Sequence, residues 1–434
     1  MPRIILLTFF LFVFFHAAFA QNLFTLEQAL AEGIQGNYDL VIANNNGQIS
    51  AQNVTYGNAG FLPRISTNIA QATSVNNTNL KFFNGVDRNA KNAETKTLVA
   101  SVGMNWTVFD GLNMFVVYQR LKTLNEIERL NMKEVLEQTV LNVESTYYNV
   151  ILQKKLLKAI EQNILLYEKI VDLVQTRLSI GAASKYELMQ AQVELNNYRS
   201  NSISQKVALE NAKVELNTLL TRDVEQTFEV EDTIRIGKRI MKEEVALTNN
   251  NTLLISERNR AVSQLLLQSS KAQYYPIVGI NTSYNYLKSQ SELGNLLFNQ
   301  TNGWSYGFTA SWNLFNGFNQ RRVVQANKIN NTNAEIGYKK ARVETESALS
   351  KSYKDYNANL EILELEKDNI RIARLVAELA IERYRLGMIS AFEMQDAQRN
   401  LLTAENRFET AKYKAKISEL QLLKIDGRIV TARR

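Results

Sequence analysis

The chain has 434 residues, a formal net charge of +7, no cysteine, and His16 as its one histidine. These counts exclude disulfides, Cys or His catalysis and ordinary zinc or copper sites, and the weak basic bias does not indicate a nucleic acid partner. No pattern builds a cleft around paired acids, as a glycosidase would need, so we expect no enzyme, no cofactor and no metal.

The first predicted element is a secretory signal over residues 1–20. Arg3 precedes a short apolar core, and the small residues of "AFA" before Gln21 form a cleavage site. An uncleaved anchor is the alternative interpretation. Beyond this segment no apolar run of about eighteen residues predicts a helical membrane span.

A helix over about 25–59 follows, and then two strands over about 62–78 and 96–110. In the second strand, apolar residues alternate with small or polar ones, which predicts a β-strand. The polar stretch 73–95 is predicted to hold the hairpin loop.

The next element is a helix over 113–178 that contains no proline. Its apolar residues are spaced alternately by about four and three positions, which is typical of a coiled coil. A glycine near 181 interrupts the pattern, and helix resumes over about 185–220. Residues 221–242 break the periodicity and are predicted to form an equatorial linker.

The same plan recurs in the second half of the chain. "WTVFDGLN" at 106–113 matches "WNLFNGFN" at 312–319, at an offset of 206 residues. We therefore predict a tandem duplication with repeats over 21–220 and 243–434. The second repeat is predicted to contain a helix over about 243–273, strands over about 276–287 and 303–315 around a polar loop at 287–303, and helices over 319–384 and 391–425 with a turn near 387.

The strands admit two interpretations, a half-buried sheet in a soluble domain or the wall of a transmembrane β-barrel. Aromatic residues near the strand ends favour the barrel, because they would form a belt at the membrane interface. The strands of one chain cannot close a barrel, and open sheet edges are not tolerated in lipid, so several chains must complete the wall. The expected belt residues are Phe61, Trp106, Phe109, Tyr274, Tyr275, Trp312 and Phe315.

The expected fold class is mainly α with a β-barrel portion: tandem-duplicated long helical hairpins plus four transmembrane strands per chain. With these elements the chain resembles the TolC family of outer-membrane efflux and secretion channels, over nearly all residues after the signal. The resemblance rests on "FTLEQAL", the two W-x-[LV]-F-[DN]-G strand ends and the two G-x-x-S-x-[YF]-E turns. "GNYDL" and "NNTLL" lack the proline that the family pattern often carries.

The resemblance implies a homotrimer with one shared barrel in outer-membrane lipid and a helical tunnel in the periplasm. It implies a passive duct for efflux, multidrug export included, or for type I secretion. The duct would dock on a periplasmic adaptor (membrane fusion) protein that belongs to an inner-membrane pump of RND or ABC type. A structural or adhesive outer-membrane coiled coil without transport is the alternative interpretation.

The two turns supply the candidate site. Glycine just past a helix end adopts positive φ without penalty, and Ser-x-x-Glu forms a capping box for the returning helix. The resemblance adds adaptor docking at these turns. The residues concerned are Gly181, Ser184, Gly387 and Ser390.

The resemblance also implies a periplasmic gate. Glu393 and Asp396 would line the aperture, and Tyr384 would reach Glu187 in the closed state. Ile389 occupies the position of the family's gate arginine, which removes a salt bridge. From the residues alone, Asp396 could equally lie on a solvated helix face, and Tyr384 could be an aromatic residue of the helix seam.

Overall fold

The computed structural model describes residues 23–241, 247–292 and 296–431, so the predicted signal at 1–20 lies outside the described residues. The chain divides into two compact units. The first comprises Met1–Tyr38, Leu136–Val245 and Leu349–Arg434, and the second comprises Asp39–Val135 and Ala246–Ala348. Each unit draws on both halves of the sequence, so the units do not coincide with the two predicted repeats, whose bounds stay a prediction from the sequence.

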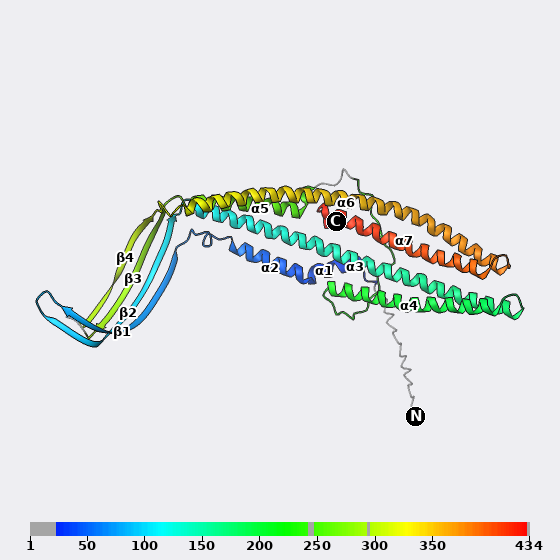
Figure 1. The fold of residues 1–434 in the computed structure, drawn as a ribbon, viewed down its shortest axis with the longest axis horizontal. Helices are drawn as coiled ribbons and strands as arrows, with labels where there is room; N and C mark the ends of the chain where they lie inside the picture. The colour runs from blue at the N-terminus through cyan, green and yellow to red at the C-terminus, as the bar shows by residue number, and fades with distance from the viewer. Residues whose placement is uncertain (1–22, 242–246, 293–295, 432–434) are drawn as a thin grey trace, which may run out of the picture. The chain divides into compact units, whose positions relative to one another are not determined.

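Two long helices contribute to both units. These are α3 (Asn113–Ser179) and α6 (Asn319–Arg385), with 67 residues each, or about 100 Å of helix at about 1.5 Å per residue. The first unit also contains α1 (Leu26–Gly36), α4 (Lys185–Leu219) and α7 (Ala391–Ile425). In Figure 1, α3 forms one helical hairpin with α4, and α6 forms a second one with α7.

The second unit contains α2 (Tyr38–Asn53), the short 3-10 helix η2 (Leu247–Asn249) and α5 (Asn251–Ala272). Its strands are β1 (Arg64–Lys81), β2 (Asp87–Phe109), β3 (Ile277–Ser291) and β4 (Phe298–Ser311). Within the described part of the chain, no helix has the length and apolar character needed to cross a membrane.

Helix starts follow local capping chemistry. Thr25, Ser184, Asn250 and Ser390 each stand in extended conformation before a helix, and each side chain accepts a hydrogen bond from a backbone N–H of the first turn. Such a cap satisfies a donor that has no partner within the helix. The polar residues at these positions therefore determine where α1, α4, α5 and α7 begin.

The sheet is antiparallel, in the order β1-β2-β3-β4 (Figure 1). The central pair β2 and β3 joins the two halves of the sequence, with Trp106 opposite Ile280. Among the residues that the structure describes, the outer strands β1 and β4 each have one edge that pairs with no other strand. Large apolar side chains on these strands are exposed, among them Ile69, Trp304 and Phe308. The sheet thus leaves its edges and much apolar surface for other partners.

The first predicted hairpin loop is too long. Pairing continues to Lys81 opposite Asp87, so the polar stretch 73–95 lies mostly within strands. Ladder hydrogen bonds join backbone groups, and Thr and Asn side chains do not interrupt them on an exposed strand. Conversely, β4 ends at Ser311, earlier than predicted, because Ser311 pairs with Ile277 at the very start of β3.

The aromatic residues at the strand ends form two matching contacts. The indole N–H of Trp106 donates to the Phe61 carbonyl at 2.9 Å, and that of Trp312 donates to the Tyr274 carbonyl at 3.0 Å. Phe109 ends β2, whereas Tyr275 precedes β3 and Phe315 follows β4. The contacts bring strand-end residues of each half together, as a belt requires; its membrane role stays a prediction.

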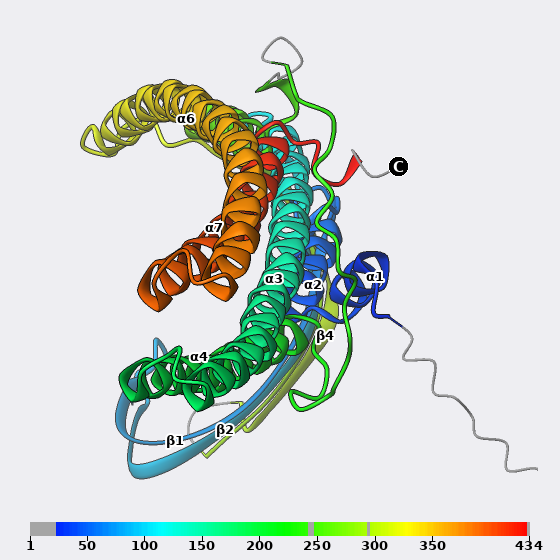
Figure 2. The same ribbon diagram turned by 90° about the vertical axis from the view of Figure 1, so that its right-hand side faces the viewer.

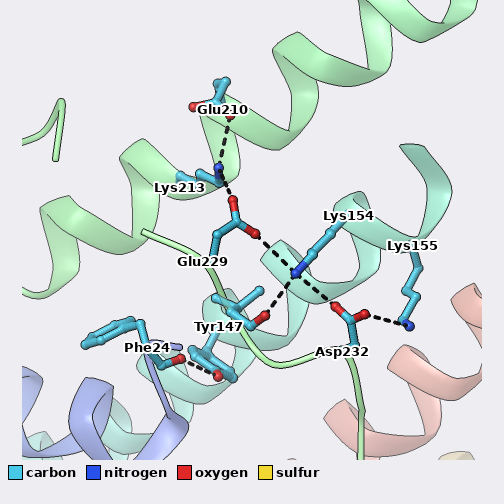
Figure 3. Close-up of polar contacts among 9 residues, drawn as sticks. Phe24, Tyr147, Lys154, Lys155, Glu210, Lys213, Glu229 and Asp232 are labelled. Atoms are coloured by element: carbon cyan, nitrogen blue, oxygen red, sulfur yellow. Dashed lines mark hydrogen bonds and ion pairs between the residues drawn. The ribbon is translucent and has the colours of Figure 1, made fainter. Parts of the chain in front are cut away.

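In the first unit, the linker after α4 is bound tightly to the helices. Lys154 of α3 lies 3.1 Å from Glu229 and 2.9 Å from Asp232, and it donates to the Val230 carbonyl at 3.0 Å (Figure 3). Burial opposes the charge on Lys154, but the two carboxylates outweigh it and raise its pKa. The hydrogen bond from Lys154 lowers the pKa of Asp232. The ammonium group is therefore the main polar anchor of this part of the linker.

Further along, the linker contacts α7 and α6. The Gly237 N–H donates to Glu419 at 3.1 Å, and Glu419 pairs with the buried Lys416 at 3.2 Å. The Ile240 N–H donates to the Tyr356 hydroxyl at 3.2 Å. The linker thus contacts both hairpins of the first unit.

Replacing Lys154 with methionine should destabilise the chain by about 1 kcal/mol at neutral pH, since the ion pairs are partly exposed. Asp232 has a folded pKa below 3.8, so its stabilisation is present above the unfolded pKa and is lost as pH falls through the folded pKa. The loss of unfolding free energy in the variant should therefore be smaller at about pH 2 than at about pH 7. Unfolding followed by circular dichroism at the two pH values measures it.

Lys155→Met is the matched control, because Lys155 pairs with Asp232 at the longer distance of 3.8 Å. It should cost clearly less than Lys154→Met. Equal losses for the two variants, or a deficit that persists at acid pH, would show that Lys154 does not anchor the linker through these carboxylates.

Candidate functional site

The two hairpin turns lie in the first unit, and Figure 2 views the ribbon from the side on which both hairpins turn. Their backbone geometry is the same. Gly181 has φ of 75° and Gly387 has φ of 74°, the left-handed region that favours glycine. Each turn closes with paired backbone bonds, Ala182 N–H to the Arg177 carbonyl and Met388 N–H to the Arg383 carbonyl. This is the Schellman arrangement, which satisfies the last carbonyls of a helix.

The two caps that follow the turns are not alike. At the second turn, Ser390 and Glu393 form a complete capping box, with the Ser390 N–H donating to the Glu393 carboxylate at 2.8 Å. At the first turn, Ser184 accepts from the Glu187 N–H at 3.2 Å. There the Glu187 carboxylate does not complete a box. The capping-box prediction is thus confirmed in full only at Ser390.

The Glu187 carboxylate instead influences Tyr384 of the other hairpin. Tyr384 is 2% exposed in the last turn of α6. Its pKa is raised, first by burial and then by the negative charge of Glu187, while Arg177 acts in the opposite sense. The Tyr384 hydroxyl is buried without a hydrogen bond of ordinary geometry.

Tyr384 belongs to an apolar cluster made by both hairpins. Tyr167 comes from α3, Leu195 from α4 and Met394 from α7, and all are buried there. Ile389 packs against the same cluster. Ile389 therefore serves packing between the hairpins.

Arg177 is a contact residue that the sequence patterns did not single out. It stands near the end of α3, donates to the Tyr384 carbonyl of α6, and lies 4.6 Å from the centre of the Tyr384 ring. It also donates to the Ala182 carbonyl of its own turn at 3.2 Å. A usable signal was present: a basic residue in the last helical turn before a glycine, repeated as Arg383.

The two predicted aperture acids are both exposed. The Glu393 carboxylate is held by its capping box, which lowers its pKa through the Ser390 N–H. Asp396 is 55% exposed, lies 3.7 Å from Arg399, and accepts from the Asn400 side chain at 3.1 Å. Asp396 thus has two polar partners on its own helix, whereas Glu393 is held by the cap.

Large apolar side chains are exposed at both turns, at matching positions of the two repeats. Ile180 and Leu386, which precede the glycines, are 74% and 67% exposed. Tyr186 and Phe392, at the start of the returning helices, are exposed as well. Apolar surface left in water at two equivalent places is typical of an interaction surface.

An inter-helix ion pair also recurs, with its charges exchanged. Glu168 of α3 pairs with Arg199 of α4 at 2.9 Å. At the positions 206 residues later, Arg374 of α6 pairs with Glu405 of α7 at 3.5 Å. Each hairpin thus keeps this ion pair between its helices, while the sign of the charge at each position is reversed.

The chain has paired long helices that end in exposed apolar turns, and an antiparallel sheet whose outer strands expose apolar side chains. These features indicate a protein that acts through contacts of its surface with other molecules. The chain belongs to the outer membrane efflux protein family, a family of channels and not of enzymes. The family model matches residues 29–222 and 244–428. The two matches correspond to the two halves of the duplication and omit most of the linker.

Solved structures show the same fold at low sequence identity. The Campylobacter jejuni CmeC outer membrane channel is 15% identical over 93% of this chain and 86% of that one, with a TM-score of 0.79. VceC from Vibrio cholerae is 13% identical over 93% and 96%, with a TM-score of 0.76. The open state of the Neisseria gonorrhoeae MtrE channel is 14% identical over 93% and 88%, with a TM-score of 0.75. Comparison with curated protein sequences gave no significant match.

These findings confirm the expected fold class in its helical hairpins, internal duplication and small antiparallel sheet. They also confirm the resemblance to the outer-membrane efflux channels. The roles of individual residues at the turns are proposals, taken up next.

Proposed function

We propose that the chain is one subunit of a homotrimeric duct that spans the outer membrane with its strands and the periplasm with its helices. It serves a tripartite efflux or type I secretion system, conducts passively, and docks on a periplasmic adaptor and an inner-membrane pump of RND or ABC type. Membership of the efflux family supports the channel. The matched apolar residues at the two turns are the observation that carries the docking role.

Surfaces left open within one chain support the trimer. Within the described ranges, each outer strand of the sheet has an edge that no strand of the same chain covers. Lipid does not tolerate such an edge unless another chain pairs with it. In the first unit, α4 and α6 also carry exposed apolar residues at multiples of about seven positions, the spacing of a coiled-coil seam. These residues are Val193, Val207 and Val214 on α4, and Leu365, Ile372 and Leu379 on α6.

The turns support a gate at the periplasmic end. In the proposed gate, Tyr384 and Glu187 would join the two hairpins of a chain in the closed state; the influence of Glu187 on the pKa of Tyr384 supports this. The similar MtrE structure is that of an open state. Asp396, and to a lesser degree Glu393, would place acidic side chains at the aperture of the trimer. Such rings attract cations and repel anions at a constriction.

Neutralising these acids should weaken cation binding at the aperture. In planar bilayers, Glu393→Gln with Asp396→Asn should raise open conductance and weaken block by a divalent cation about fivefold, the equivalent of roughly 1 kcal/mol. Gln at 393 can still complete the capping box, so the turn should be preserved.

Asp368→Asn is the matched control, since Asp368 forms an exposed pair with Arg371 at the same 3.7 Å and the same spacing along α6. It should leave block unchanged. Unaltered conductance and selectivity in the double variant would remove the acidic aperture from the proposal.

Purification with its adaptor tests the proposal as a whole. The expected result is a trimer by light scattering that conducts ions in planar bilayers and retains a periplasmic adaptor from the same cell. A trimer that does neither would favour the structural or adhesive alternative.

A further inference from the structure

We propose that Arg177 holds the turn of the second hairpin against the first, and we call this residue the latch. Three contacts of one guanidinium carry this inference. It donates to the Tyr384 carbonyl, stacks on the Tyr384 ring at 4.6 Å, and donates to the Ala182 carbonyl at 3.2 Å. The same group thus bonds to both turns.

The position of Arg177 explains why a cation is needed there. Both α3 and α6 end at the turns, and the carbonyls at a helix C-terminus carry partial negative charge. The Tyr384 carbonyl already accepts a hydrogen bond from the Gly387 N–H at 3.0 Å. Arg177 therefore donates to the second lone pair of this carbonyl oxygen. Because a guanidinium has several donors in a planar fork, it can bond to carbonyls of two helices at once.

The rest of the contact between the hairpins is mainly apolar packing, with Tyr384 and Tyr167 buried in the shared cluster. Glu187 of the first hairpin also acts on Tyr384, whose pKa its negative charge helps to raise. The contact between the hairpins therefore depends on apolar packing, on Glu187 with Tyr384, and on Arg177. Because the hydrogen bonds of Arg177 carry a charge, we expect their loss to favour separation of the hairpins.

Sequence duplication supplies a matched control. Arg383 occupies the equivalent position, 206 residues later, and its side chain is exposed. Arg177→Met should speed hydrogen exchange in both turns, residues 177–190 and 383–396, by about tenfold or more, as expected for loss of charged hydrogen bonds. Arg383→Met should leave exchange in both turns unchanged. Arg177→Lys should give an intermediate rate, since an ammonium lacks the planar fork.

The consequence for conductance rests on the proposed channel function, so it is measured separately in planar bilayers on the same purified trimers. We expect the Arg177→Met channel to be open more of the time than the wild type and Arg383→Met to match the wild type. If hydrogen exchange is faster in Arg177→Met but neither the wild type nor any variant conducts, the proposed role of Arg177 stands and the proposed channel function is wrong. If both variants conduct like the wild type, and hydrogen exchange is equal in Arg177→Met and Arg383→Met, the channel function stands and the proposed role of Arg177 is wrong. An unchanged melting temperature in Arg177→Met shows that the effect is local.

Discussion

Replacing Gly111 with alanine should destabilise the second unit by about 2–4 kcal/mol. Gly111 turns the chain from β2 into α3 with φ of 70°. A Cβ at this position would lie 2.4 Å from the Ala272 carbonyl oxygen and 2.8 Å from Tyr275 Cβ. Neither is the far end of a flexible side chain, so the end of α5 would have to move. Thermal unfolding followed by circular dichroism measures the loss.

The duplication again provides the control. Gly317 is the equivalent glycine, with φ of 66°, and a Cβ there would meet nothing within 4 Å. Gly317→Ala should therefore cost only the backbone strain, about 1 kcal/mol. If both substitutions cost the same, close packing around Gly111 is not what requires glycine.

Replacing Ile180 and Leu386 together with aspartate should abolish adaptor binding and export while leaving ion conductance intact. Each side chain presents exposed apolar surface at a turn, and apolar anchors of an interface commonly contribute about 2 kcal/mol each. The double variant should thus bind an adaptor at least about 100-fold more weakly. Binding is measured by titration of the purified adaptor, and export by accumulation of its substrate in cells.

Lys185→Asp controls for the new negative charge, because Lys185 is exposed beside the first turn and contributes no comparable apolar surface. It should bind the adaptor within a few-fold of the wild type. Normal adaptor binding by the double variant would mean that the turns are not the docking surface. Loss of conductance together with binding would instead indicate a misfolded channel.

The sequence predicts most of the fold because the fold repeats simple periods. Alternation in strands such as β2, seams of apolar residues in α3, and glycines at the turns are all local signals. The ends of the strands were less predictable. Pairing partners determine them, so β1 extends to Lys81 and β4 ends at Ser311.

The candidate site was predictable in its turns but not in its cross-hairpin contacts. The motifs at Glu187 and Glu393 look alike in sequence, yet one carboxylate completes a cap and the other acts on Tyr384. What separates them is the packing of the opposite hairpin, which no local pattern encodes. The same holds for Arg177, whose partner is 207 residues away.

Exchange of charges between the repeats was readable in principle. Glu168 with Arg199 and Arg374 with Glu405 occupy equivalent positions with opposite signs. An alignment of the two halves shows both charges of a pair reversed together. This pattern would have predicted that α3 contacts α4, and α6 contacts α7, at these positions. Apolar periodicity alone carries no information on which charged residues meet.

Single-channel recording of the purified trimer in a planar lipid bilayer tests the central claim most directly. A passive trans-periplasmic duct should insert in discrete conductance steps, favour cations, and lose that preference when Asp396 is neutralised. Protein that is trimeric by light scattering yet gives no conductance steps, in the wild type and in Arg177→Met alike, would contradict the account.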